Sequence, residues 1–340
     1  MTAGTSTGAD AASEARRAER RAIAESLLES PPPLQQLGAR RVVVRERSVV
    51  HLSRSRPVVR WELTVDTGSG PAPLTVIGKG YRKGGGEEAG RLLGQLRRAG
   101  FDDPRLQVPA PFGFDPLRQV LAQEEAPPTT LRTLLDAAPE PAAPAVGQVG
   151  RWLARLHGVH GVDVPVLPGD FERHKLTEYA TALVEALPAA AARLRALTAR
   201  TLDVLAAGGA RPVVTHGDFQ PGNIHLDEDR VVVIDFDRAA YAPAARDLGH
   251  FIGQTLTMGA SRHGSLEAAA AWVEAFLHGY TTAGGDPAAV AAAPAYVART
   301  FAEVLFYRLV VRPVPDRSFV SAWLDAWERC LDPPPGGGRT

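Results

Sequence analysis

Residues 215–239 read THGDFQPGNIHLDEDRVVVIDFDRA and contain the most informative group of polar residues in the chain. The apolar runs NIHL and VVVI lie on either side of the acidic residues 227–229, a pattern that predicts a β-hairpin with its turn at those residues. Asp218 and Asn223 precede this hairpin, and Asp235 ends its second strand. The sequence therefore predicts that one loop and one strand pair gather these three side chains.

The residue types in this stretch suit phosphoryl transfer. That reaction needs a group that orients the attacking hydroxyl, and oxygen ligands that hold Mg²⁺ against the phosphates. Asp218 can orient a hydroxyl, while the amide oxygen of Asn223 and the carboxylate of Asp235 can bind the metal ion. Asp218 and Asn223 could instead be simple turn formers, but Asp235 downstream favours the functional interpretation. We expect His216 to support the loop by hydrogen bonding rather than to transfer a proton.

The chain before this stretch has the alternating pattern of an antiparallel sheet. Val59, Trp61, Leu63 and Val65 share one face of a predicted strand. The predicted order is three strands, one helix and two strands, with the strands at residues 42–50, 58–65, 74–83, 111–115 and 118–123 and the helix after the glycines at 84–86. These elements form a small β-rich lobe over residues 37–125.

The composition then shifts to residues that favour helices. The candidate helices span residues 130–138, 143–158, 172–207, 265–284, 287–312 and 316–330. The predicted fold class is α+β, with the β-rich lobe followed by a larger, mainly helical lobe over residues 126–331. Residues 1–36 are predicted to be a helical or disordered extension, and residues 332–340 a disordered tail.

Charge and cysteine content exclude several classes of protein. Lysine plus arginine and aspartate plus glutamate each total 38, so the chain lacks the positive balance typical of nucleic-acid or anionic-membrane binders. The single cysteine, Cys330, excludes an intramolecular disulfide framework. We see neither a signal sequence nor an apolar stretch near the roughly 20 residues of a membrane span. A cytoplasmic protein without nucleic-acid or membrane partners is expected.

The run HGDFQPGN, followed by a strand that ends in Asp-Phe, resembles the aminoglycoside phosphotransferase and choline kinase family, whose members carry HGDxxxxN and then a strand ending in Asp. The resemblance covers most of residues 40–330. It implies a two-lobed, protein-kinase-like fold and a phosphotransferase that uses ATP and Mg²⁺. It also implies that Asp218 is the catalytic residue and that Asn223 and Asp235 are the metal ligands.

The same resemblance suggests a nucleotide site in the β-rich lobe. Lys79, at the end of the third strand, would contact the α and β phosphates, and Ile77 on the same face would cover the adenine. Glu88 would share the inward stripe of the helix with its leucines and hold Lys79, with Glu87 as the close competitor.

Two further positions complete the residues that the resemblance implies. The backbone from Glu124 to Ala126 would bond the edge of the adenine, as the hinge between the lobes. Asp247, in the run ARDLGHF, would brace the catalytic loop.

The chain also departs from the family pattern. The loop HLSRSRP contains no glycine to cover the phosphates, so nucleotide binding would be weak, or Ser53 and Ser55 would replace the glycines. Asp235 is followed by Phe-Asp rather than Phe-Gly, which argues against a glycine-pivoted switch.

The sequence does not identify the acceptor of the phosphoryl group. Residues 251–340 contain eight acidic and seven basic residues, which is not the strongly acidic surface expected for a polycationic aminoglycoside. The first hypothesis is an ATP-dependent kinase that acts on a hydroxyl of a small antibiotic or metabolite. The alternatives are a kinase for Ser or Thr of a peptide that works with a partner enzyme, and a nucleotide-binding scaffold that has lost catalysis.

Overall fold

The computed structural model describes residues 6–137, 143–208 and 210–332. The chain divides into two compact units, Met1–Ala126 and Pro127–Thr340. The first unit contains an antiparallel sheet and the second is mainly helical, so the predicted α+β class is confirmed. From residue 333 on, the tail that was predicted to be disordered lies outside the described residues.

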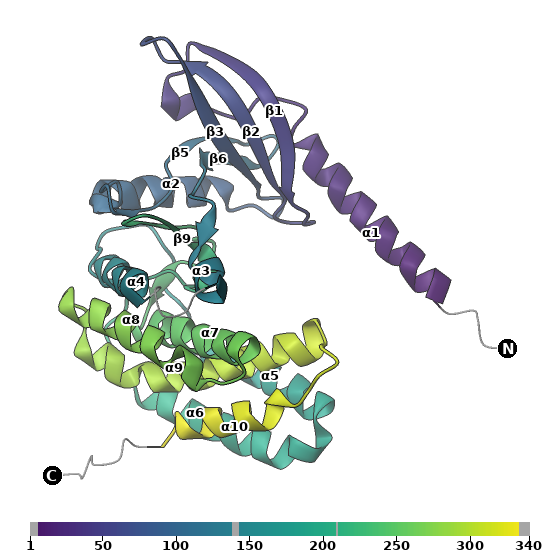
Figure 1. Cartoon of the computed structure of the whole chain (residues 1–340), viewed down its shortest axis with the longest axis vertical. Coiled ribbons are helices and arrows are strands. Elements are labelled where there is room, and N and C mark those ends of the chain that lie inside the picture. The colour runs from purple at the N-terminus through teal and green to yellow at the C-terminus, as the bar shows by residue number, and fades with distance from the viewer. Residues whose placement is uncertain (1–5, 138–142, 209, 333–340) are drawn as a thin grey trace. The chain divides into compact units, whose positions relative to one another are not determined.

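The sheet of the first unit has five strands in the order β1-β2-β3-β6-β5 (Figure 1). Neighbouring strands are antiparallel throughout. The strands are β1 (Arg41–His51), β2 (Val58–Asp66), β3 (Pro71–Gly80), β5 (Pro111–Asp115) and β6 (Val120–Glu124). Helix α2 (Gly86–Leu96) lies between β3 and β5 in the chain. The predicted order of three strands, one helix and two strands is therefore correct.

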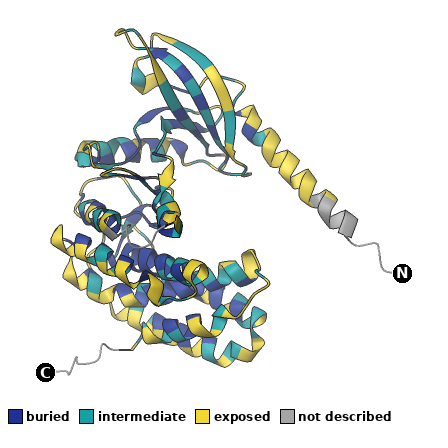
Figure 2. Ribbon diagram, viewed as in Figure 1, coloured by how far each residue is buried: buried dark blue, intermediate teal, exposed yellow. Residues whose placement is uncertain are grey.

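One face of this sheet forms an apolar core. Alternate residues of β2, among them Trp61 and Leu63, are buried and pack with Val76 of β3. The N-terminal extension forms helix α1 (Ser6–Ser26), whose last turn adds Ala24 and the following Leu27 to this core. Residues 13–22 of α1 are exposed (Figure 2). The end of the extension therefore contributes to the packing of the sheet.

The second unit is built from helices α3 (Leu131–Ala137), α4 (Ala143–His157), α5 (Phe171–Ala186), α6 (Ala191–Ala207), α7 (Ala245–His263), α8 (Ala270–Thr282), α9 (Pro287–Phe306) and α10 (Phe319–Arg329). Helix α7 was not among the predicted helices. The single helix predicted over residues 172–207 is wrong, because the chain leaves the helical conformation at Leu187, where φ is −134°. Pro188 has no amide hydrogen and disfavours a helical residue before it.

The predicted hairpin at residues 227–229 is present. Strands β9 (Ile224–Asp227) and β10 (Arg230–Val233) pair in antiparallel register, with Ile224 opposite Val233. Strand β8 (Val213–Thr215) pairs separately with β11 (Ala240–Ala242). Asp218 lies in the loop after β8, Asn223 directly precedes β9, and Asp235 follows β10. These are the three side chains singled out in the sequence.

Helices α7 and α9 approach each other closely because α7 carries glycines at their contact. A Cβ atom on Gly249 would lie 2.3 Å from the Cβ of Tyr296, and one on Gly253 would lie 2.6 Å from the Cγ2 of Thr300. Larger side chains would force the two helices apart. This packing sets the distance between polar side chains on α7 and on α9.

Helix α9 and the turn after it, Pro287–Val311, are long and apolar enough to meet a simple criterion for a membrane span, which the sequence analysis did not foresee. In the structure, 61% of the qualifying window is buried inside the protein, as in a core helix. Arg299 and Glu303 lie in this segment and are themselves buried.

Candidate active site

A tight turn after β8 forms the loop that carries Asp218. Gly217 has a φ of +81°, and a Cβ atom there would lie 2.1 Å from the carbonyl oxygen of Arg238. Only glycine combines this backbone conformation with such a close approach. The loop therefore packs directly on the segment that follows β10.

Asp247, in the first turn of α7, holds this loop through its carboxylate. Its Oδ2 accepts a hydrogen bond of 2.7 Å from the amide of His216, and its Oδ1 accepts one of 2.9 Å from the amide of Gly217. His157 contacts Oδ2 at 3.4 Å. Asp247 is fully buried, and burial would raise its pKa, but the hydrogen bond and charge of His157 outweigh burial and lower it. The carboxylate therefore stays charged while it supports the loop.

His216 joins the loop to the end of β10. Its Nδ1 accepts a 3.2 Å hydrogen bond from the amide of Asp218, and its Nε2 donates a 2.9 Å bond to the carbonyl of Ile234. In this pair of bonds Nε2 is the donor and Nδ1 is the acceptor. His216 is fully buried, and its bonds are those of a residue that supports the loop.

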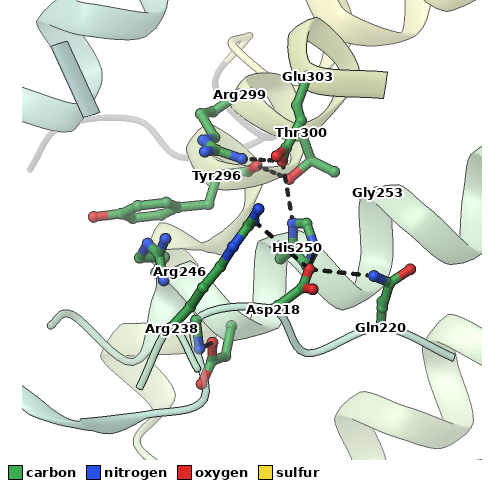
Figure 3. A network of polar contacts seen from close by, with 12 residues as sticks. Asp218, Gln220, Arg238, Arg246, His250, Gly253, Tyr296, Arg299, Thr300 and Glu303 are labelled. Carbon is green, nitrogen blue, oxygen red and sulfur yellow. Dashed lines mark hydrogen bonds and ion pairs between the residues drawn. The ribbon is translucent and has the colours of Figure 1, made fainter. Parts of the chain in front are cut away.

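The carboxylate of Asp218 lies among donors that favour its charged form (Figure 3). Its Oδ1 accepts bonds from His250 Nε2 at 3.1 Å and from Gln220 Nε2 at 3.2 Å. The guanidinium of Arg238 lies 4.0 Å from the same oxygen. Burial would raise the pKa of Asp218, but the hydrogen bond and charge of His250, with the charge of Arg238, lower it well below its ordinary range. Asp218 is therefore an anion that can accept a hydrogen bond.

Asn223 and Asp235 adjoin at one end of the hairpin. The amide of Ile234 donates to the carbonyl of Asn223 at 3.0 Å, and Ile224 and Val233 are paired next to them. Asp235 has a φ of +71°, an uncommon conformation for a residue with a side chain. Such strain is frequent at functional positions.

The donor set at this end of the hairpin fits Mg²⁺. The Nδ2 group of Asn223 donates to the carbonyl of Asp218 at 2.9 Å, which leaves its Oδ1 on the opposite side of the amide. One amide oxygen and the carboxylate of Asp235 are suitable ligands for an ion that takes its other ligands from water and nucleotide phosphates. Within the described ranges, no cluster of three His, Cys, Asp or Glu side chains offers a metal site formed by protein groups alone.

A buried charge network continues from Asp218 into the helical core. His250 on α7 contacts Asp218 through Nε2, and its Nδ1 lies 3.5 Å from Oε2 of Glu303 on α9. Glu303 also accepts a hydrogen bond from Arg299, and Arg299 contacts Glu172 on α5 at 2.9 Å. Burial would raise the pKa of Glu303, but the charges of Arg299 and His250 lower it. His250 was not among the residues predicted for the site, and its position one helical turn after Asp247 is the signal that could have indicated its role.

Comparison with known proteins agrees with this geometry. The sequence pattern of the phosphotransferase enzyme family matches residues 60–293, which is more than half of the chain. The chain belongs to this family. The predicted family resemblance is thereby confirmed, and the family is one of small-molecule kinases. No curated protein matches the sequence.

Solved structures share the fold of this phosphotransferase at low sequence identity. The amicoumacin kinase hAmiN in complex with AMP-PNP, Ca²⁺ and Ami has a TM-score of 0.56 and 17% identity, with 94% of this chain and 95% of that chain covered. A choline/ethanolamine kinase family protein from Mesorhizobium loti has a TM-score of 0.55 and 17% identity, with 80% and 85% covered. An aminoglycoside phosphotransferase in complex with ADP and hygromycin B has a TM-score of 0.54 and 15% identity, with 87% and 96% covered. The protein-kinase-like fold is confirmed.

The predicted nucleotide residues of the phosphotransferase lie in its first unit. Ile77 and Lys79 point to the same face of β3, and both are partly buried. The Nζ of Lys79 lies 5.3 Å from the centre of the Tyr81 ring. Leu92 and Leu96 of α2 are buried, but the side chain of Glu88 is 68% exposed and lies 4.0 Å from Arg91. The inward position expected for Glu88 is therefore not observed.

The predicted hinge positions lie at the end of the first unit. The amide of Glu124 donates to the carbonyl of Ala110 at 2.8 Å, and its carboxylate accepts from the amide of Ala110 at 3.1 Å. The backbone amide of Glu124 is thus already bonded within the sheet, and Ala126 is the last residue of the unit. The nucleotide-binding roles of Ile77, Lys79, Glu88, Glu124 and Ala126 stay predictions.

Proposed function

We propose that this phosphotransferase transfers the γ-phosphoryl group of ATP to a hydroxyl group of a small molecule. The observation that carries the proposal is the position of Asp218. Its charged carboxylate lies in the wall of a cavity of about 500 Å³ within the second unit. This volume suits a small molecule. Asn223, which donates to the backbone of Asp218, adjoins the candidate metal ligand Asp235.

In the proposed reaction, the carboxylate of Asp218 accepts a hydrogen bond from the acceptor hydroxyl and orients its oxygen. This oxygen forms a bond to the γ-phosphorus, while the bond from that phosphorus to the β–γ bridging oxygen breaks and ADP leaves. The hydroxyl proton passes to Asp218 and then to water. Because the transition state of phosphoryl transfer is loose, a carboxylate with a low pKa serves mainly by orienting the hydroxyl.

Asn223 and Asp235 would hold Mg²⁺, which neutralises charge on the nucleotide phosphates. Lys79 would contact the α and β phosphates, as the family resemblance implies. Related structures in complex with ADP or AMP-PNP support ATP as the donor. We propose the cytoplasm, where ATP is available, as the place of the reaction.

The first test of this function separates nucleotide binding from transfer. A thermal shift with ATP should appear in the presence of Mg²⁺, because a ligand that binds the native state raises its apparent stability. The shift should disappear in Asp235→Ala and persist in Asp229→Ala, a control in the exposed hairpin turn. Retention of the Mg²⁺-dependent shift in Asp235→Ala would remove Asp235 from the metal site.

The second test addresses catalysis. Asp218→Ala should lower transfer of labelled phosphoryl to hydroxyl compounds by about two to four orders of magnitude, the scale of a lost general base, while ATP binding is retained. Unchanged turnover would refute the proposed role of Asp218. Labelling of Ser or Thr in a peptide, with no labelling of small alcohols, would replace the small-molecule acceptor with a peptide.

A further inference from the structure

The cavity at Asp218, termed here the acceptor cavity, has a wall rich in arginine. The catalytic loop, helix α7 and the end of α9 all contribute to it. Its charged lining residues are Asp218, Glu303, Arg132, Arg238, Arg308 and Arg312, together with His250. Four guanidinium groups thus accompany two carboxylates in one small space.

The two carboxylates already have positive partners of their own. Glu303 is hydrogen bonded to the buried Arg299, which does not line the cavity, and lies 3.5 Å from His250. Asp218 accepts a hydrogen bond from His250 and lies 4.0 Å from Arg238. The positive partners of Glu303 and Asp218 therefore already balance the negative charge of the wall, without the other arginines of the cavity.

Arg132, Arg308 and Arg312 form no close ion pair of this kind within the described residues, although the charge of Arg308 also acts on Asp316, with which it lines a further cavity. The described part of the chain places no carboxylate oxygen within 4.0 Å of any of the three. Arg308 is held in position, because its guanidinium lies 4.8 Å from the centre of the Phe319 ring and donates to Ser261 Oγ at 3.0 Å. Its Nε is buried and has no hydrogen-bond partner among the described residues. Because this Nε is buried, contact with a ligand in the cavity would come from the terminal nitrogens of the fixed guanidinium.

A second cavity of about 390 Å³ continues the first. Both are lined by Arg132, Gln220, Gln254, Val304 and Arg308. The second cavity adds the hydroxyl groups of Thr257 and Ser261, and none of the described residues in its lining is acidic. Its one further arginine, Arg262, lies 3.3 Å from Asp136. The positive wall thus extends away from Asp218 into a polar, non-acidic space.

Arg308 and Arg312 belong to the end of α9, where the helix changes its hydrogen-bond spacing. The π-helical turn Tyr307–Val311 follows α9, and the amide of Arg312 donates to the carbonyl of Tyr307 at 2.7 Å, five residues earlier. Such turns insert an extra residue into a helix and occur frequently at functional sites. Here the turn supplies Tyr307 and Arg308 to the acceptor cavity, and Arg312, the residue directly after the turn, also lines it.

From this charge distribution we infer that the acceptor is a small hydroxyl compound that also carries an anionic group, a carboxylate or a phosphate. The inference rests on the proposed function and specifies its substrate. The hydroxyl would bind at Asp218, and the anionic group would bind Arg308 with support from Arg132 and Arg312. Guanidinium groups match carboxylate and phosphate oxygens through paired hydrogen bonds. The same wall disfavours a polycation, because confined charges of one sign repel a ligand of that sign.

A charge-matched panel of acceptors tests the inference with the full chain, ATP and Mg²⁺. The panel contains glucose, glucuronate, glucose 6-phosphate and glucosamine, with the polyamine kanamycin and an acidic Ser-containing peptide. The measurement is the transfer of labelled phosphoryl to each compound, with a thermal shift for each in the absence of nucleotide. We expect glucuronate or glucose 6-phosphate to exceed glucose in kcat/KM by about tenfold or more, the scale of a charge-assisted hydrogen bond.

Arginine variants link that preference to the cavity. Arg308→Gln should raise the KM of the anionic acceptor by about tenfold, with little change in its kcat, in the KM of ATP or in the KM of glucose. Arg312→Gln should have a smaller effect in the same direction. Arg195→Gln, on the exposed surface of α6, removes the same charge away from the cavity and should change none of these values.

The outcomes separate this inference from the proposed function. A preference for glucosamine or kanamycin, labelling of the peptide alone, or an unchanged preference in Arg308→Gln would overturn the anionic acceptor and leave the kinase function intact. Absence of transfer to every compound would count against the proposed function. In that case, anion-dependent thermal shifts that are lost in Arg308→Gln would still support the inference, and their absence from the wild type would overturn it.

Discussion

His250 Nε2 lies 3.1 Å from Oδ1 of Asp218, so a side chain of helix α7 donates directly to the candidate catalytic carboxylate. The other ring nitrogen lies 3.5 Å from Glu303. His250 thus lies between the two carboxylates and connects Asp218 to the helical core.

The pH dependence of activity should report this contact. Removal of His250 takes away a hydrogen bond and a charge that lower the pKa of Asp218, so burial should raise that pKa. The acid limb of the kcat/KM profile should then move to higher pH in His250→Ala, and by less in His250→Gln, which keeps a neutral donor. The profiles of the three folded proteins provide the check. Coinciding acid limbs would contradict the coupling.

Replacement of Arg299 should test the buried network. Arg299→Met leaves Glu303 and Glu172 without their shared partner and should lower the free energy of unfolding by about 3–5 kcal/mol. Arg193→Met, which breaks surface contacts to Asp325 and Glu328, should cost about 0–1 kcal/mol. Denaturant titration measures both values. Equal losses would show that burial of the network carries no special cost.

Acid should destabilise the protein in a defined range. The pKa values of Asp218, Asp247, Glu172 and Glu303 are lowered in the folded state, since their hydrogen bonds and positive partners outweigh burial. Their contribution is thus present above the pKa of about 4 of the unfolded chain and is lost as pH falls toward the folded values. The melting temperature should be nearly constant from neutral pH to about 5 and fall steeply below about 4. A melting temperature that stays constant below that pH would contradict the assignment.

Gly217 should tolerate no side chain. Gly217→Ala places a Cβ atom 2.1 Å from the carbonyl of Arg238, at a φ of +81°. We expect a loss of stability above 1 kcal/mol, on the order of an overpacked site, and a fall in kcat because Asp218 is displaced. At Gly222 the nearest atom to a new Cβ, Oε1 of Gln220, is 3.9 Å away, so Gly222→Ala should have little effect on stability. Thermal unfolding compares the two variants, and equal melting temperatures would be inconsistent with the close approach at Gly217.

The positive φ of Asp235 should determine how far each substitution at this position lowers stability. At a φ of +71°, glycine and asparagine are tolerated, whereas a β-branched residue is strained. Asp235→Asn should therefore retain the melting temperature, and Asp235→Val should lower stability by about 1–3 kcal/mol. Both should lose Mg²⁺-dependent nucleotide binding, because neither keeps the carboxylate. Equal stability of the two variants would show that the conformation stores no strain.

Local patterns predicted much of this architecture. The alternation around Trp61 predicted β2, and the acidic residues 227–229 predicted the hairpin. Asp218 and Asn223 could be predicted as site residues because they are five positions apart in one turn, so the turn holds them close together. In the structure, Asn223 indeed donates to the backbone carbonyl of Asp218.

What the sequence did not reveal depends on contacts between distant segments. His250 and Glu303 are 53 positions apart and meet because Gly249 and Gly253 let α7 and α9 approach closely. No local pattern encodes that distance. Glu88 was misplaced because the spacing of four residues to Leu92 was extended into the first turn of α2, where the side chain faces solvent.

The π-helical turn Tyr307–Val311 offers a way for the choice of acceptor to change in evolution separately from catalysis. Deleting one residue there would restore α-helical spacing and rotate the chain that follows by about 100° around the helix axis. Arg312 would leave the acceptor cavity, whereas Asp218, His250 and Glu303 precede the turn and would keep their positions. A single in-frame codon loss could thus redirect substrate preference without touching the machinery of transfer. Insertions and deletions at this turn, rather than point substitutions alone, are where descendants of such an enzyme could diverge.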